Sequence, residues 1–133
     1  DELVSTSVHA VTRAIGLGFK RPHIALISYR GREHSRLAPL ARLGPYSLRA
    51  PTGRYDLLGN PILTDGDILI DSVLRFKGRA APCVILTEID FEQLDDKAVR
   101  RLFVGATRAT MKLMLVVSER SSAVLRARLA AAS

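Results

Sequence analysis

Two short basic segments combine glycine with lysine or arginine in a way that suits the binding of an anion. The first is residues 72–78 (SVLRFKG), which precede the apolar run 83–86 (CVIL), and the second is residues 100–109 (RRLFVGATRA). Glycine lets the backbone approach a ligand closely. Arginine presents a planar fork of N–H donors that matches the oxygens of a phosphate. The two segments therefore predict contacts with phosphate groups.

A tyrosine and an arginine form a third candidate. Tyr29 and Arg30 directly follow residues 23–28 (HIALIS), a short apolar run that is typical of a buried strand. Ligands of open α/β sheets bind at the carboxyl ends of the strands. The position of the pair makes it a candidate for ligand binding, and a surface tyrosine beside a solvated arginine is the alternative interpretation.

Other reactive residue types form no recognisable site. Cys83 lies within an apolar run and is expected to be a small buried hydrophobe, and the three histidines lack metal-ligand spacing. Glu88 and Asp90 follow the strand predicted at 83–86. We expect these two carboxylates to face solvent rather than to act in catalysis.

The scaffold that must position these residues alternates between strands and helices. Apolar side chains at three- and four-residue steps predict helices, and short apolar, β-branched runs predict strands. Helices are expected at 3–15, 32–43 (interrupted by Pro39), 94–108 and 121–132, and strands at 23–28, 67–74, 83–86 and 112–117. Residues 44–66 are rich in turn-forming glycine and proline, with short strands expected near 46–49 and 54–57. This alternation predicts an α/β fold with a parallel sheet covered on both faces.

Composition limits the functional classes further. The 133 residues fit one domain, and a formal net charge of +7 favours a polyanionic partner such as nucleic acid. No run approaches the roughly 20 apolar residues of a membrane helix, and no signal peptide opens the chain, so we expect a cytoplasmic location. The phosphate-loop sequence G-x-x-x-x-G-K-[ST] is absent. We therefore expect a fragment of a larger protein.

Taken in order, Tyr29-Arg30, residues 72–78 and residues 104–109 resemble the fourth, fifth and sixth motifs of superfamily 1 DNA helicases of the UvrD-like group. The resemblance covers residues 24–117. It implies that residues 1–133 are the second, C-terminal motor domain of such a helicase. The implied fold is a three-layer RecA-like domain of the P-loop NTPase type with a mainly parallel sheet.

The resemblance also implies a half-site for ATP. In this family ATP and Mg lie between two motor domains and are bound mainly by the N-terminal one, which these residues do not include. Arg30 and Arg108 would stabilise the transferring phosphoryl group, and Tyr29 would stack on adenine. Gly78 and Gly105 would lie close to the nucleotide. The isolated domain is therefore expected to be inactive as an ATPase.

Single-stranded DNA is the second partner that the resemblance implies, with Ser72, Arg75 and Lys77 as the contacting residues. Two positions depart from the family pattern. Leu74 stands where a histidine is common, and Ala80 where a glutamate commonly holds the ribose.

Those departures and the positive charge keep a second hypothesis open, a non-catalytic basic nucleic-acid-binding module of α/β fold. A phosphate loop encoded upstream would favour the helicase, and its absence would favour the module. A free-standing small-molecule enzyme has no support, because the sequence lacks a nucleophile with a base and a cofactor fingerprint.

Overall fold

A mainly parallel six-stranded sheet organises the chain. The computed structural model describes residues 2–31, 33–76 and 78–132. The strand order is β2-β3-β6-β1-β7-β8; β2 pairs antiparallel with β3, and every other neighbouring pair is parallel. The strands are β1 Ile24–Ser28, β2 Arg42–Leu43, β3 Tyr46–Arg49, β6 Ile68–Ser72, β7 Ala81–Ile89 and β8 Ala109–Val117.

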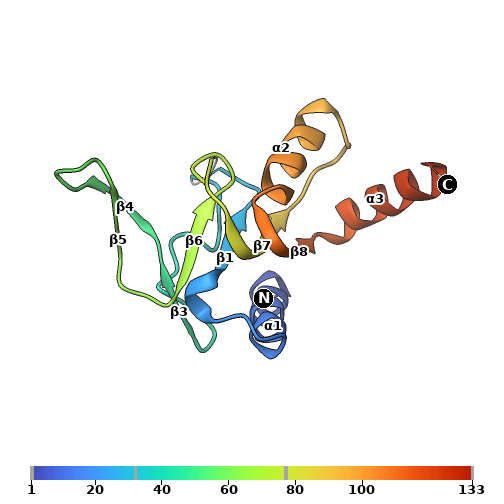
Figure 1. Cartoon of the computed structure of the whole chain (residues 1–133). Coiled ribbons are helices and arrows are strands. Elements are labelled where there is room, and N and C mark those ends of the chain that lie inside the picture. The colour runs from blue at the N-terminus through green and yellow to red at the C-terminus, as the bar shows by residue number, and fades with distance from the viewer. Residues whose placement is uncertain (1, 32, 77, 133) are drawn as a thin grey trace.

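Helices cover both faces of this sheet. The helices are α1 Glu2–Gly16, α2 Asp96–Ala106 and α3 Glu119–Ala132, and a 3-10 turn, Arg21–His23, leads into β1. Figure 1 shows α1 and α2 on opposite sides of β7 and β8. The alternating side chains of β1 divide accordingly, with Leu26 in the core beneath α1 and Ile27 in the core that α2 covers. The α/β prediction is confirmed, and the fold is consistent with a RecA-like domain.

The connection after β1 is not the helix that its apolar pattern predicted. Among the described residues of 32–43 there are only turns and the short strand β2. Pro39 disfavours helical backbone at the residue before it and removes an N–H. Ser35 and the backbone N–H of Arg36 instead bind the Glu88 carboxylate. A long-range polar contact therefore overrides a local apolar pattern.

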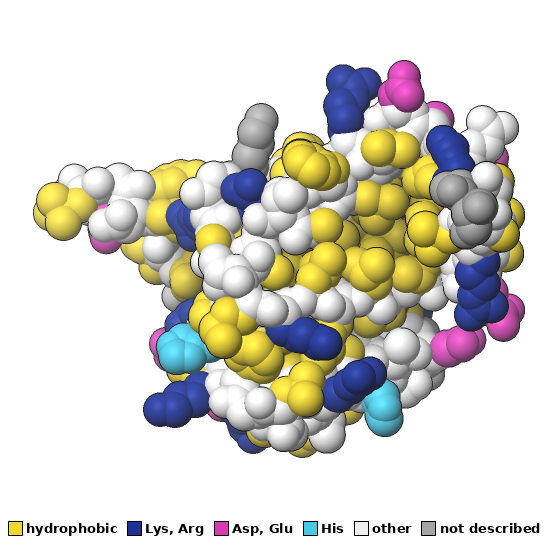
Figure 2. Space-filling model, turned by 45° about the vertical axis from the view of Figure 1, so that its right-hand side comes forward, with side chains coloured by type: hydrophobic (Ala, Val, Ile, Leu, Met, Phe, Trp, Pro, Cys, Tyr) yellow, Lys and Arg dark blue, Asp and Glu magenta, His cyan; other side chains and the backbone are white. Residues whose placement is uncertain are grey.

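Strand β8 also differs from its prediction, because it is an edge strand rather than a buried one. Val116 is its only buried residue, whereas Met111 and Leu115 are exposed. Two apolar residues of α2, Val99 and Phe103, are exposed as well. Figure 2, in which the side of the molecule that carries α2 and β8 is turned forward, shows hydrophobic side chains gathered on the visible face. The sequence pattern identified apolar positions correctly but could not show that no further strand pairs with β8 in the part described.

A separate hairpin occupies the turn-rich segment. Strands β4 Pro51–Tyr55 and β5 Pro61–Leu63 form a two-stranded antiparallel sheet that projects from the body in Figure 1. The strand predicted at 54–57 is thus displaced toward the N-terminus. Leu57 and Leu58 lie at the exposed tip. No helix among the described residues combines the length and hydrophobicity needed to span a bilayer.

Candidate nucleotide and nucleic-acid site

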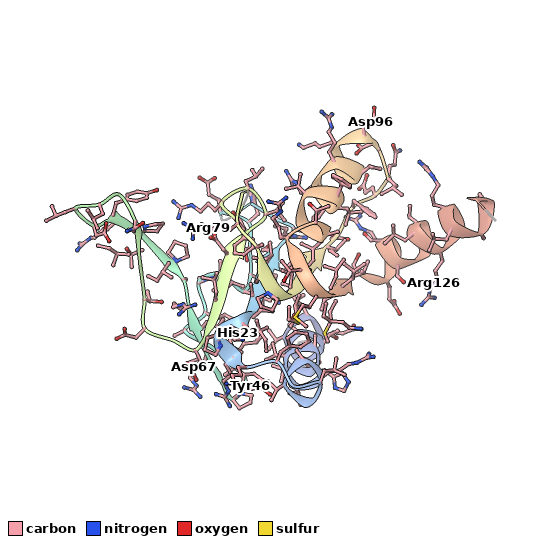
Figure 3. The ribbon with its side chains drawn as sticks, in the orientation of Figure 1. His23, Tyr46, Asp67, Arg79, Asp96 and Arg126 are labelled. Atoms are coloured by element: carbon pink, nitrogen blue, oxygen red, sulfur yellow. The ribbon has the colours of Figure 1, made fainter. Side chains whose placement is uncertain are left out.

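The two basic segments meet at the edge of the sheet where β7 and β8 begin. Helix α2 runs back from the end of β7, so its last turn reaches this edge. Figure 3 shows that Asp96, in the first turn of α2, lies far from Arg79. Arg108 Nη1 donates a hydrogen bond to the carbonyl of Arg79 at 3.3 Å. The N–H of Ala81 donates to the carbonyl of Arg108 at 3.0 Å. The fold thereby brings residues 104–109 against the turn that ends residues 72–78.

Arg108 retains donor capacity at this edge. Its Nη2 donates to Thr107 Oγ1 at 3.3 Å, and its Nε is buried without a hydrogen-bond partner among the described residues. A buried N–H without a partner is uncommon and destabilising. Because the partners of this guanidinium are neutral oxygens, an incoming phosphate would not have to displace a carboxylate from it.

The two candidate glycines have different environments. Gly78 is exposed with φ +84°, and a side chain built there would meet no atom within 4 Å. Its backbone is therefore open to a ligand. Gly105 is buried in α2, and a Cβ there would lie 2.8 Å from Leu86 Cδ1. Close packing of α2 on β7 explains this glycine without any ligand.

The candidate DNA contacts belong to the end of β6 and to the residues that follow it in sequence before β7. Val73 and Phe76 are buried in the core beneath α2, while Arg75 faces outward. Ser72 is buried, and its Oγ accepts a hydrogen bond from the Arg75 N–H at 3.3 Å. Lys77 lies outside the described residues. Arg75 is thus exposed to a polyanion, whereas the Ser72 hydroxyl stabilises the turn.

Tyr29 lies at the other edge of the sheet, in an enclosed position. Tyr29 is 6% exposed. The Phe91 ring lies edge-on to it, with 6.2 Å between the ring centroids, and the Arg101 guanidinium lies 5.3 Å from the centroid of the Tyr29 ring. Arg101 Nη1 also donates to the Tyr29 carbonyl at 3.3 Å. Burial raises the pKa of the phenol. An adenine could stack on this ring only after Arg101 moved away.

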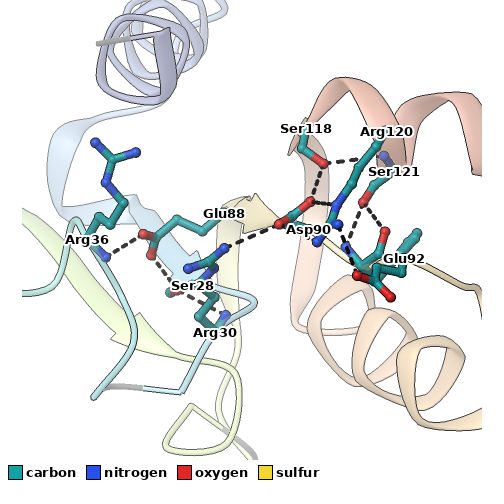
Figure 4. Close-up of polar contacts among 10 residues, drawn as sticks. Ser28, Arg30, Arg36, Glu88, Asp90, Glu92, Ser118, Arg120 and Ser121 are labelled. Carbon is teal, nitrogen blue, oxygen red and sulfur yellow. Dashed lines mark hydrogen bonds and ion pairs between the residues drawn. The ribbon is translucent and has the colours of Figure 1, made fainter.

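Arg30 is held by a carboxylate. Its Nη2 lies 3.3 Å from Asp90 Oδ2, and Asp90 also receives hydrogen bonds from Arg120 Nε at 2.7 Å and Ser118 Oγ at 2.7 Å (Figure 4). These bonds, led by the one from Arg120, lower the pKa of Asp90 to about 2. Asp90 therefore remains ionised and keeps two arginines together at the carboxyl end of β7.

Glu88 does not face solvent as expected. It is only 4% exposed and lies within β7. Its carboxylate accepts hydrogen bonds from Ser28 Oγ at 2.5 Å, Ser35 Oγ at 2.5 Å and the Arg36 N–H at 2.6 Å. A glutamate between apolar strand residues is the signal that could have revealed this burial, because a buried carboxylate requires such partners.

A cavity of about 360 Å³ opens beside this cluster, and Arg30, Arg36, Glu88 and Asp90 are part of its lining. Parallel sheets commonly bind ligands at this end of their strands. No group of three or more potential metal ligands occurs in the part of the chain that the structure describes. The lining of the cavity offers charged and hydroxyl groups to a ligand.

The two candidate catalytic arginines do not meet. The carbonyl of Arg108 pairs with Ala81, and the N–H of Tyr29 pairs with the carbonyl of Thr87. Six strand residues correspond to about 20 Å along β7. Arg30 and Arg108 thus lie at opposite edges of the sheet, whereas Arg108 and Gly78 share one edge.

Part of the chain matches a known protein family. Residues 67–116 match the model of the UvrD-like helicase C-terminal domain. This region of the chain is therefore similar to the C-terminal domain of UvrD-like helicases. The match includes both segments that meet at Arg108, and Tyr29 and Arg30 lie outside it. No curated protein matches the chain. This similarity supports a helicase-related role.

Proposed function

We propose that residues 1–133 form the second motor domain of an ATP-dependent DNA helicase or translocase of superfamily 1. One observation carries the proposal. The segments 72–78 and 104–109, both inside the helicase-domain match, meet at one sheet edge, where the Arg108 guanidinium donates to the carbonyl of Arg79, the residue after Gly78. The phosphate loop that the reaction needs is absent from these 133 residues, so the proposal requires another motor domain in the same protein.

Arg108 is the residue proposed to act on the reacting phosphate. A guanidinium placed before the reaction stabilises negative charge as it grows on the phosphoryl group. The exposed backbone at Gly78 leaves room for phosphate oxygens beside it. These groups fit the phosphate end of ATP, whereas Mg and most of the nucleotide would be bound by the other motor domain. ATP supplies the phosphoryl group whose transfer drives movement along the strand.

Arg30 is proposed as a second cation for the ATP site, with a different requirement. Its guanidinium would have to leave Asp90, and the 3.3 Å separation is the longest of the three polar contacts that Asp90 makes with Arg30, Arg120 Nε and Ser118. Arg30 would therefore contribute only in a state of the protein in which the nucleotide competes with Asp90 for the Arg30 guanidinium.

Arg75 is proposed to contact the backbone of single-stranded DNA, together with Lys77. Exposed cations at a sheet edge bind phosphates without regard to base sequence. The exposed Leu74 and Ala80 beside them favour the second candidate function, a basic nucleic-acid-binding module without ATPase activity. The two functions differ in whether Arg108 contributes to ATP turnover.

The test is steady-state ATP hydrolysis by the full-length protein carrying Arg108→Ala or Arg108→Lys. We expect each change to lower kcat by on the order of 10³-fold, because lysine lacks the planar fork of donors. Arg128→Ala, at an exposed site on α3, is the matched control and should hydrolyse ATP normally. Near-normal turnover by Arg108→Ala would refute the ATPase role and leave the binding module as the function.

A further inference from the structure

Glu88 has a backbone conformation that glutamate rarely adopts. Its φ is +59°, and it is the only non-glycine residue with a positive φ among residues 2–31, 33–76 and 78–132. Such a conformation is energetically unfavourable for a residue with a side chain, and it persists only where the surroundings hold the residue in place. The hydrogen bonds of the Glu88 side chain supply that restraint.

One branch of those bonds leads to Arg30. Ser28 Oγ donates to Glu88 Oε2 at 2.5 Å and accepts from the Arg30 N–H at 3.1 Å. The serine thus connects the carboxylate to the backbone of Arg30, as Figure 4 shows. Its proton is committed to Glu88, which leaves its lone pairs directed at the N–H of Arg30.

A second branch fixes the segment that follows. Ser35 Oγ donates to the same Oε2 at 2.5 Å and accepts from the Ala38 N–H at 3.0 Å. The Arg36 N–H donates to Oε1 at 2.6 Å. One buried carboxylate therefore holds both Arg30 and the turn at 35–38, which have no regular secondary structure of their own.

Only a carboxylate satisfies all three donors. Oε2 accepts from both serines and Oε1 accepts from the Arg36 N–H, whereas the amide of glutamine has a single oxygen. Its NH2 group must therefore face either the two serine hydroxyls or the Arg36 N–H. Glycine at this position would remove every acceptor but would adopt a positive φ without strain. The two substitutions therefore separate the hydrogen bonds from the backbone conformation.

We propose that Glu88 is a positioning residue that acts through Ser28 to hold Arg30 in the lining of the cavity. The inference rests on the proposed role of Arg30 in the ATP site. Glu88 does not touch the nucleotide in this account. Glu88 fixes the position of the Arg30 backbone. That position decides whether the Arg30 guanidinium can reach a phosphate once it leaves Asp90.

The first test is a double-mutant cycle on kcat in the full-length protein, with Glu88→Gln, Arg30→Ala and both together. We expect Glu88→Gln to lower kcat by about 10- to 100-fold, as misplacement by an ångström does, with little change in KM for ATP. In the Arg30→Ala background, Glu88→Gln should have no further effect. Independent effects that multiply in the double variant would refute positioning through Arg30.

The second test does not depend on ATP. Hydrogen exchange of the Arg30 and Arg36 amides should become at least tenfold faster in Glu88→Gly, while amides of β1 and β7 exchange as in the wild type. Glu88→Gly also guards against misfolding, since glycine tolerates this φ. Unchanged exchange at these two amides would overturn the positioning role. Faster exchange combined with normal turnover by Arg30→Ala would instead refute the ATP-site role of Arg30, and with it the catalytic part of the inference.

Discussion

Arg108 and Arg30 are the same residue type in opposite electrostatic settings. Arg108 donates to a carbonyl and a hydroxyl, while Arg30 pairs with the ionised Asp90. Displacing a neutral oxygen from a guanidinium costs less free energy than separating the guanidinium from a carboxylate. We therefore assign Arg108 the larger share of phosphate stabilisation and expect Arg30 to contribute only after Asp90 releases it.

The Asp90 cluster predicts a pH dependence of stability. The pKa of Asp90 falls from an ordinary value of 3.8 to about 2 in the folded protein. The resulting stabilisation is complete above about pH 4 and is lost as the pH falls through 2. The side chain is 22% exposed, so we expect on the order of 1–2 kcal/mol. Urea unfolding of wild type and Asp90→Asn should differ by this amount at pH 5 and converge near pH 2. A pH-independent difference would contradict the assignment.

Arg75 predicts a salt dependence of binding to single-stranded DNA. Its side chain is exposed in the turn before β7. Each neutralised phosphate of a single strand adds about 0.7 to the slope of log affinity against log salt concentration. Arg75→Ala should therefore reduce that slope by about 0.7, while Arg128→Ala should leave it unchanged. Equal slopes for wild type and Arg75→Ala would remove Arg75 from the DNA contact.

At the scale of elements, apolar runs predicted the strands β1, β6 and β7 because fully buried parallel strands require continuous hydrophobicity. The helix expected at 32–43 was wrong, since its apolar spacing competes with Pro39 and with hydrogen bonds to Glu88, which is far away in sequence. The hydrogen-bond cluster around Glu88 could not be predicted either, because its members are far apart in sequence. Local sequence shows that a carboxylate is present but not which serines will surround it.

The junction of β3 and β6 predicts a stability effect at Gly66. A Cβ there would lie 2.3 Å from the Leu48 carbonyl oxygen, which is backbone and cannot rotate away. Gly66→Ala should lower the free energy of unfolding by about 1–3 kcal/mol. Gly16→Ala is the matched control, because a Cβ at Gly16 meets nothing within 4 Å and φ is not positive. Equal unfolding free energies for the two variants would contradict the described junction.

The β4–β5 hairpin predicts the opposite outcome. Leu57 and Leu58 are 105% and 87% exposed, so the hairpin tip adds nothing to the core. Replacing both with serine should change the free energy of unfolding by less than about 0.5 kcal/mol. Leu26→Ala, in the fully buried core, should cost about 2–5 kcal/mol. A large loss in the hairpin variant would show that the tip packs against something in solution.

At the scale of the whole molecule, candidate residues lie at both edges of one sheet. Gly78 and Arg108, at one edge, lie within the helicase-domain match, whereas Tyr29 and Arg30, at the other edge, lie outside it. The sequence ordered these motifs correctly along the chain. It could not show that they separate by about 20 Å, because that distance depends on strand direction and register.

The most direct measurement of the central claim is chemical protection of Arg108 in the full-length protein. Arginine side chains would be modified with phenylglyoxal and mapped by mass spectrometry, without nucleotide, with ADP, and with ADP plus aluminium fluoride as a mimic of the transferring phosphoryl group. The account predicts strong protection of Arg108 by the mimic, weaker protection by ADP, and no protection of Arg128. Equal reactivity of Arg108 in all three conditions would contradict the claim that this sheet edge meets the phosphates of ATP.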